Sequence, residues 1–94
     1  MSVRVQSVQH VRDYVLELRF SDGSHGQIDF RDRVVGRGGV FTALETIDVF
    51  QQVRVDAEAG TITWPNGVDF CPEVLHHVAT GAPLPRTPES HRAA

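Results

Sequence analysis

The residues best suited to chemistry lie in the segment 61–75, which holds the only tryptophan and the only cysteine of the chain. Trp64, Asn66 and Asp69 bring together an aromatic ring, an amide and a carboxylate, groups through which proteins bury area and form hydrogen bonds with a partner. We predict these three residues as partner-binding. A structural interpretation also explains each of them: Trp64 fills the core, residues 66–67 form a turn, and Asp69 accepts backbone N–H bonds at a helix start.

Cys71 is a candidate nucleophile in the same segment. A nucleophilic cysteine needs a base within hydrogen-bond reach, and His76 or His77 would have to supply it. Both histidines follow along the same predicted helix, from which their side chains do not easily turn back onto the sulfur. Lone cysteines are mostly small, buried, apolar residues. We therefore expect Cys71 to be buried, and we rank an enzyme that uses it last among the functions.

The sequence has no metal or cofactor pattern. Adjacent helix residues such as His76 and His77 point about 100° apart, whereas zinc ligands on one helix recur at i and i+4. We expect both histidines to be exposed. The glycine-rich segment 36–39 lacks the Gly-Lys-Ser/Thr ending of a phosphate-binding loop and is interpreted as a flexible connector. We predict no catalytic residue, no metal site and no cofactor.

Length and composition are those of one small globular domain, with 94 residues, of which 40% are hydrophobic and 22% charged. No apolar run approaches the roughly 18 residues of a membrane span. Residues 1–6 lack the apolar stretch of a secretory signal, and one cysteine cannot form an internal disulfide. These features predict a cytoplasmic protein without a membrane partner.

The charge pattern argues against a nucleic-acid partner. The net charge is −3, and all nine basic residues are arginines. These arginines are scattered along the chain, whereas nucleic-acid binding depends on clustered positive charge.

The N-terminal part predicts three strands in an antiparallel meander. Residues 3–8 carry valines whose alternation slips by one position, which indicates a bulge or the end of the strand. Residues 9–13 are predicted to form a polar connection. Residues 14–20 show the period of two that is typical of a half-buried strand. The Asp-Gly pair in the next turn favours a hairpin that continues into a strand at 25–30.

Helical segments and a second hairpin follow. One helical turn is predicted at 31–35. Apolar residues three apart between positions 41 and 50 form one stripe, which we assign to two short helical turns. Two further strands are predicted at 53–56 and 61–64.

The last helix is predicted to begin at Pro72, which suits a first helical turn because its missing N–H has no intrahelical partner there. It is predicted to end near Gly81, a residue type that favours the C-terminal cap. We expect Val74, Leu75 and Val78 to face inward.

These elements predict an α+β fold with a small antiparallel sheet of about five strands, in the order β-β-β, short helices, β-β, α, covered on one face by helices. Residues 1–81 form the single predicted domain. Residues 82–94 are rich in proline and polar residues and are predicted to be a disordered tail.

The chain resembles the domain-of-unknown-function family 2442, a family of small bacterial domains. The resemblance runs from Val3 to about Val78 and rests most specifically on the Trp-Pro-Asn-Gly-x-Asp element at 64–69. It implies a small α+β domain. Some members are fused to a helix-turn-helix domain, and others are standalone chains encoded beside another small protein in toxin–antitoxin-like pairs. This chain is similar to the standalone kind, and the resemblance implies no established activity and no catalytic residues.

We therefore expect a non-enzymatic protein-interaction module that is antitoxin-like or accessory to a small neighbouring protein. Its partner is that protein or a second copy of the chain, because an exposed edge strand suits such pairing. The alternative is a small regulatory domain that binds a ligand or a nucleic acid. An enzyme built on Cys71 is the third class.

Overall fold

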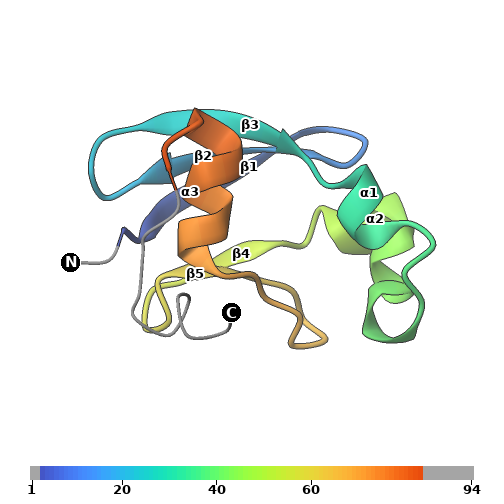
Figure 1. The fold of residues 1–94 in the computed structure, drawn as a ribbon. Helices are drawn as coiled ribbons and strands as arrows, with labels where there is room; N and C mark the ends of the chain where they lie inside the picture. The colour runs from blue at the N-terminus through green and yellow to red at the C-terminus, as the bar shows by residue number, and fades with distance from the viewer. Residues whose placement is uncertain (1–2, 84–94) are drawn as a thin grey trace, which may run out of the picture.

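The structure is a computed structural model that describes residues 3–83. Within these residues it is an α+β fold of five short strands in two antiparallel sheets, with helical segments between and after them (Figure 1). The fold class is confirmed, although the strands divide between two sheets where the sequence suggested one. The predicted disordered tail at 82–94 lies outside the described residues except for its first two positions.

The first sheet contains β1 (Val5–Arg12), β2 (Val15–Phe20) and β3 (His25–Asp29) in that order, each antiparallel to the next. A tight turn joins β2 to β3, with Gly23 at a φ of 89°. Glycine adopts this left-handed conformation without strain. The predicted hairpin is confirmed.

The alternation in β2 is what fixes the orientation of this sheet. Leu16, Leu18 and Phe20 are buried on its inner side, whereas Arg19 is exposed. Because successive side chains of a strand point to opposite faces, this pattern sets one face of the sheet toward the core. The period of two predicted for this strand is confirmed.

β1 is longer than the sequence indicates. The strand continues through Arg12, so the prediction of a polar connection at 9–13 is wrong. Its polar side chains are mostly exposed, and the backbone ladder with β2 holds the strand without an apolar pattern. The register shift between Val5 and Ser7 confirms the predicted bulge. The chain turns only at Asp13, which has a φ of 41°.

The second sheet is the hairpin of β4 (Arg54–Asp56) and β5 (Thr61–Thr63). It meets the first sheet near the start of β1, where the Val5 N–H donates to the Gly60 carbonyl at 2.9 Å. The hairpin therefore lies beside β1, as Figure 1 shows, although it is not part of the three-stranded ladder.

The segment between the sheets consists of short helical pieces. These are α1 (Arg31–Val34), η1 (Gly39–Phe41), η2 (Ala43–Glu45) and α2 (Ile47–Phe50). The helical turn predicted at 31–35 is confirmed. The apolar stripe forms three pieces where two were predicted. Thr46, with a ψ of 123°, is extended and separates η2 from α2. Between η1 and η2 lies the single residue Thr42, whose backbone is helical. Leu44 and Phe50 of this stripe are buried.

α3 (Pro72–Thr80) has the predicted beginning and end, with Pro72 in its first turn and Gly81 at a φ of 79° after it. Leu75 is buried against the core. Val74 and Val78 are 38% and 37% exposed, so the prediction that both face inward is wrong. They lie on the flank of the helix, because only a narrow stripe centred on Leu75 meets the sheets.

α3 packs closely against β3. A Cβ atom added to Gly26 would lie 2.2 Å from the Ala79 carbonyl oxygen, so only glycine lets the helix approach this far. The wider prediction, that helices cover one whole face of a sheet, stays a prediction beyond this contact.

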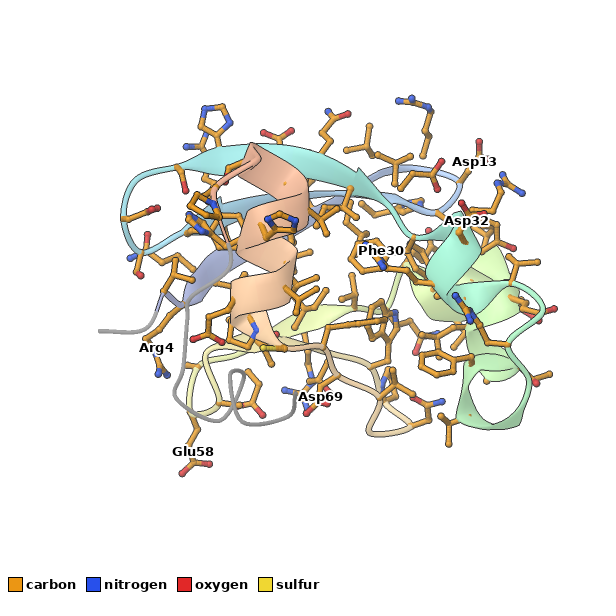
Figure 2. The ribbon with its side chains drawn as sticks, viewed as in Figure 1. Arg4, Asp13, Phe30, Asp32, Glu58 and Asp69 are labelled. Carbon is orange, nitrogen blue, oxygen red and sulfur yellow. The ribbon has the colours of Figure 1, made fainter. Side chains whose placement is uncertain are left out.

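One hydrophobic core joins both sheets and the helical segments. Its buried members come from nearly every element: Val5, Leu16, Leu18, Phe20, Ile28, Phe30, Val34, Leu44, Phe50, Ile62, Trp64, Val68 and Leu75. Phe30, labelled in Figure 2, points into this core from the end of β3. Burial of these side chains is the main stabilising contribution to the fold.

Candidate functional site

Trp64 lies directly after β5 and is 1% exposed. Its Nε1 donates to the Phe50 carbonyl at 2.7 Å. The indole packs against Phe30, Phe50 and Phe70, with ring centroids 5.6 to 6.3 Å apart. The structural interpretation therefore describes Trp64, and its buried ring does not offer a partner the aromatic surface that we predicted.

Asn66 lies at the tip of a tight turn that follows Trp64. The Gly67 N–H donates to the Trp64 carbonyl at 2.9 Å, and the Trp64 N–H donates to the Val68 carbonyl at 3.0 Å. Pro65 presets the second position of this turn, and Gly67 has a φ of 89°, which glycine tolerates. The predicted turn is confirmed, and the chain returns alongside β5.

The Asn66 side chain forms one hydrogen bond within this turn and one to a distant segment. Its Oδ1 accepts the Val68 N–H at 3.2 Å, and its Nδ2 donates to the Val40 carbonyl at 2.9 Å. The turn is thereby held against η1, in which Val40 lies. Yet Pro65, Asn66 and Gly67 remain exposed, so the structure presents an exposed turn whose backbone is well restrained.

Asp69 pairs with Thr63 through an isolated β-bridge and is exposed. The expectation that Asp69 caps the last helix is wrong. α3 is preceded by Cys71 at its N-cap and has no side-chain cap hydrogen bond. Within residues 3–83, the Asp69 carboxylate has no hydrogen bond or ion pair. In Figure 2 it lies at the side of the molecule away from β3.

The exposed residues around this turn form what we call the turn surface: Val40, Pro65, Asn66, Gly67 and Asp69. Val40 is 60% exposed, the largest fraction among the exposed large hydrophobic residues of the described chain. The turn surface therefore combines an apolar side chain, an amide and a carboxylate. Asn66 and Asp69 were predicted from the sequence, but Val40 was not. Val40 is 26 residues away from Asn66 in the chain, and the hydrogen bond between them brings it to this turn.

Cys71 is exposed, so the prediction of a buried cysteine is wrong. Its Sγ lies 3.2 Å from the Glu73 carboxylate. Among the described residues neither His76 nor His77 forms a hydrogen bond with this sulfur, so the base that a nucleophilic cysteine needs is not beside it.

His76 is held away from Cys71 by a contact that the sequence did not indicate. Its Nε2 lies 2.9 Å from Asp22 Oδ2 and 3.1 Å from Ser24 Oγ, both in the β2–β3 turn. Its ring packs edge-on against Phe20. The prediction that His76 is simply exposed is wrong, whereas His77 is exposed as expected.

The contacts of His76 with Asp22 and Ser24 connect α3 to the β2–β3 hairpin. A catalytic relay places the carboxylate and the hydroxyl on opposite nitrogens of the imidazole, whereas both contact the same nitrogen here. The Ser24 hydroxyl and backbone N–H, which donate to the carboxylate, lower the pKa of Asp22, and His76 contributes in the same direction.

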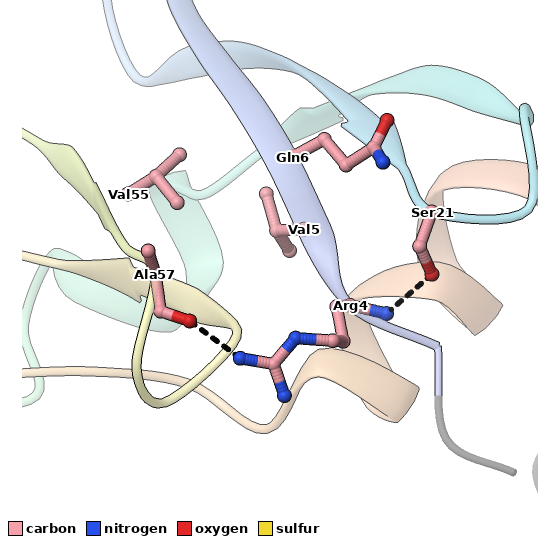
Figure 3. A pocket seen from close by; sticks show the side chains of 6 residues that line it. All are labelled: Arg4, Val5, Gln6, Ser21, Val55 and Ala57. Carbon is pink, nitrogen blue, oxygen red and sulfur yellow. Dashed lines mark hydrogen bonds between the residues drawn. The ribbon is translucent and has the colours of Figure 1, made fainter.

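A shallow pocket of about 410 Å³ lies between the start of β1 and the β4–β5 hairpin (Figure 3). Its lining residues are Arg4, Val5, Gln6, Ser21, Val55 and Ala57. The Arg4 guanidinium donates to the carbonyls of Ala57 and Glu58. The charged group of this pocket is thus engaged in holding the hairpin against β1.

Neither a metal cluster nor a membrane span is found in the described part of the chain. No group of three or more His, Cys, Asp and Glu side chains there could hold a metal ion. None of the helices between residues 3 and 83 is long and apolar enough to cross a membrane.

The comparison with protein families matches residues 5–81 to the family described as protein of unknown function (DUF2442). Because this match covers most of the chain, the protein belongs to that family, as its Trp-Pro-Asn-Gly-x-Asp element indicated. No curated protein and no solved structure matches it.

Proposed function

We propose that the protein is a non-enzymatic protein-interaction module that binds another small protein through the turn surface, as an antitoxin-like or accessory partner of a neighbouring bacterial gene product in the cytoplasm. The observation that carries the proposal is Asp69. Its carboxylate neither caps α3 nor forms a hydrogen bond within the described residues, so the fold does not account for it.

The restraint of the turn supports a binding role. Its backbone bonds and the two Asn66 bonds hold the loop in one conformation before any partner arrives. A restrained loop loses less conformational entropy on binding than a mobile one. Binding residues are also found disproportionately on loops that a rigid scaffold positions.

The chemistry of the turn surface indicates the kind of partner. Val40 offers an apolar contact, and Asp69 offers an acceptor for an arginine, a lysine or a backbone N–H. We therefore infer that the partner presents an apolar side chain beside a basic or N–H donor group.

The positions of the reactive residues support a non-enzymatic role. Cys71 contacts Glu73, and His76 is engaged by Asp22 and Ser24. A cysteine nucleophile needs a base beside it, whereas Cys71 and His76 each contact other residues.

A pull-down of the tagged full chain from its native host, with mass spectrometry, tests the proposal. We expect a stoichiometric small protein with the unmodified chain and its loss with Asp69→Asn or Val40→Asp. Glu58→Gln is the matched control, because Glu58 is an exposed carboxylate on the β4–β5 turn, apart from the turn surface (Figure 2). Capture that survives Asp69→Asn and Val40→Asp would contradict the proposed site.

The alternative, a regulatory domain for a small ligand or a nucleic acid, gains less support from the geometry. Arg4 in the pocket already donates to two carbonyls of the protein. A gel-shift titration at low salt tests the nucleic-acid form of this alternative, because phosphate contacts are strongest there.

A further inference from the structure

The hydrogen bonds at the two ends of the β2–β3 ladder show which backbone groups of β3 point outward. The Phe30 N–H donates to the Tyr14 carbonyl at 2.8 Å, and the Phe20 N–H donates to the Ser24 carbonyl at 2.9 Å. Hydrogen-bonded and non-hydrogen-bonded pairs alternate along an antiparallel ladder. The even-numbered residues of β3 therefore bond to β2, and its odd-numbered residues direct their N–H and C=O groups to the outer edge.

The outward groups belong to His25, Gln27 and Asp29. Within residues 3–83, no hydrogen bond satisfies them, and Figure 1 shows β3 as an outer strand of its sheet. Proteins usually protect such an edge with proline, lysine or a bulge. β3 has none of these, and its register with β2 is regular, whereas the register shifts lie in β1.

The side chains of this edge are self-complementary about Gln27. In an antiparallel pair of two β3 strands with Gln27 opposite its own copy, His25 lies opposite Asp29 and Asp29 lies opposite His25. Each cross-strand neighbour is thus a pair of side chains that can form a hydrogen bond with each other. The His25 imidazole has no hydrogen bond within the described residues, and only Oδ1 of Asp29 is used, by the Arg31 N–H at 2.9 Å.

We propose that two copies of this chain form a two-fold dimer by antiparallel pairing of β3 with β3, in the register that places Gln27 opposite Gln27. The outward residues form three hydrogen-bonded pairs in this register, and each pair exchanges two backbone bonds, so about six are formed. The two three-stranded sheets become one continuous sheet. This surface is separate from the turn surface, so a dimer can still bind the partner proposed above.

Sedimentation velocity of the full chain over a range of concentrations tests the dimer, with Gln27→Pro as the first variant. Proline removes the outward N–H of position 27, which the fold of one chain does not use, and proline is tolerated on edge strands. We expect a concentration-dependent dimer in the unmodified chain and a monomer with Gln27→Pro. Circular dichroism verifies that the variant is folded.

His25→Asp and His25→Arg form a matched pair that does not depend on Gln27→Pro folding. Aspartate at 25 faces Asp29 of the second copy with a like charge, whereas arginine at 25 faces it with an opposite charge. We therefore expect His25→Asp to raise the dimer Kd by about tenfold and His25→Arg to preserve the dimer. Within one chain, His25 lies opposite Arg19. An effect on the fold of one chain would therefore favour His25→Asp, whose charge is opposite to that of Arg19, over His25→Arg. A chain that is monomeric at every concentration, or a dimer that none of these substitutions weakens, would overturn the proposal.

Discussion

Replacing Trp64 by phenylalanine tests the role that the structure assigns to the indole. The substitution removes the hydrogen bond from Nε1 to the Phe50 carbonyl, which is 2.7 Å long. That carbonyl also accepts the Val53 N–H at 3.3 Å, so it keeps one donor and the lost bond costs about 1 kcal/mol. The smaller ring leaves a cavity among Phe30, Phe50 and Phe70 that costs about 1–2 kcal/mol more.

The expected loss for Trp64→Phe is therefore about 2–3 kcal/mol in the free energy of unfolding. Small proteins lose about 1 kcal/mol of stability per molar urea, so the midpoint should fall by about 2–3 M. Urea unfolding followed by far-ultraviolet circular dichroism is the assay, because the variant has no tryptophan fluorescence.

Asp69→Asn is the matched comparison from the same motif. The Asp69 carboxylate forms no hydrogen bond within residues 3–83. The free energy of unfolding of the Asp69→Asn variant should therefore stay within about 0.5 kcal/mol of the value for the unmodified chain. A midpoint shift of less than about 0.5 M for Trp64→Phe, or an equal loss for both variants, would refute this division between a structural and a functional residue.

Three further predictions concern the rest of the fold. Gly26→Ala should destabilise the protein by about 1–3 kcal/mol in urea unfolding, because the new Cβ meets the Ala79 carbonyl; an unchanged midpoint would show that α3 does not pack there. The pKa of Asp22 is lowered from 3.8 in the folded state, so its stabilising contribution is complete above that pH and is lost as the pH falls through the lower folded value. Asp22→Asn should flatten the acid limb of the urea midpoint against pH, and an identical limb would contradict this. Cys71 should react with a thiol reagent in the native protein; labelling only after denaturant is added would contradict its exposure.

Local patterns in the sequence determined the parts of the fold that could be predicted. The alternation in β2 and the Asp-Gly turn after it depend on neighbouring residues, and both are present in the structure. The same is true of Pro72 and Gly81 at the two ends of α3. Each of these signals arises from backbone geometry within a few residues of the chain.

Contacts between distant segments account for what could not be predicted. His76 meets Asp22 across 54 residues, and Asn66 meets Val40 across 26. No spacing rule indicates such pairs, since they depend on how α3 and the turn pack on other elements. The exposure of Val74 and Val78 has the same origin, because the width of the contact between α3 and the sheets decides which apolar residues are covered.

The candidate site was predicted only in part. Asn66 and Asp69 were singled out by residue type and spacing, and they stay predicted binding residues. Trp64 was singled out for the same reason, but the core uses its area and its N–H. Aromatic rings stabilise both protein cores and protein–protein interfaces by burying a large apolar area. Residue type alone therefore does not distinguish the two roles.

Hydrogen exchange on the captured complex is the most direct test of the turn surface as the binding site. Amide exchange is compared between the isolated chain and the chain bound to its co-purified protein. We expect slower amide exchange at residues 66–69 and at Val40 in the complex. Unchanged exchange in these residues, with slowing confined to other parts of the chain, would contradict it.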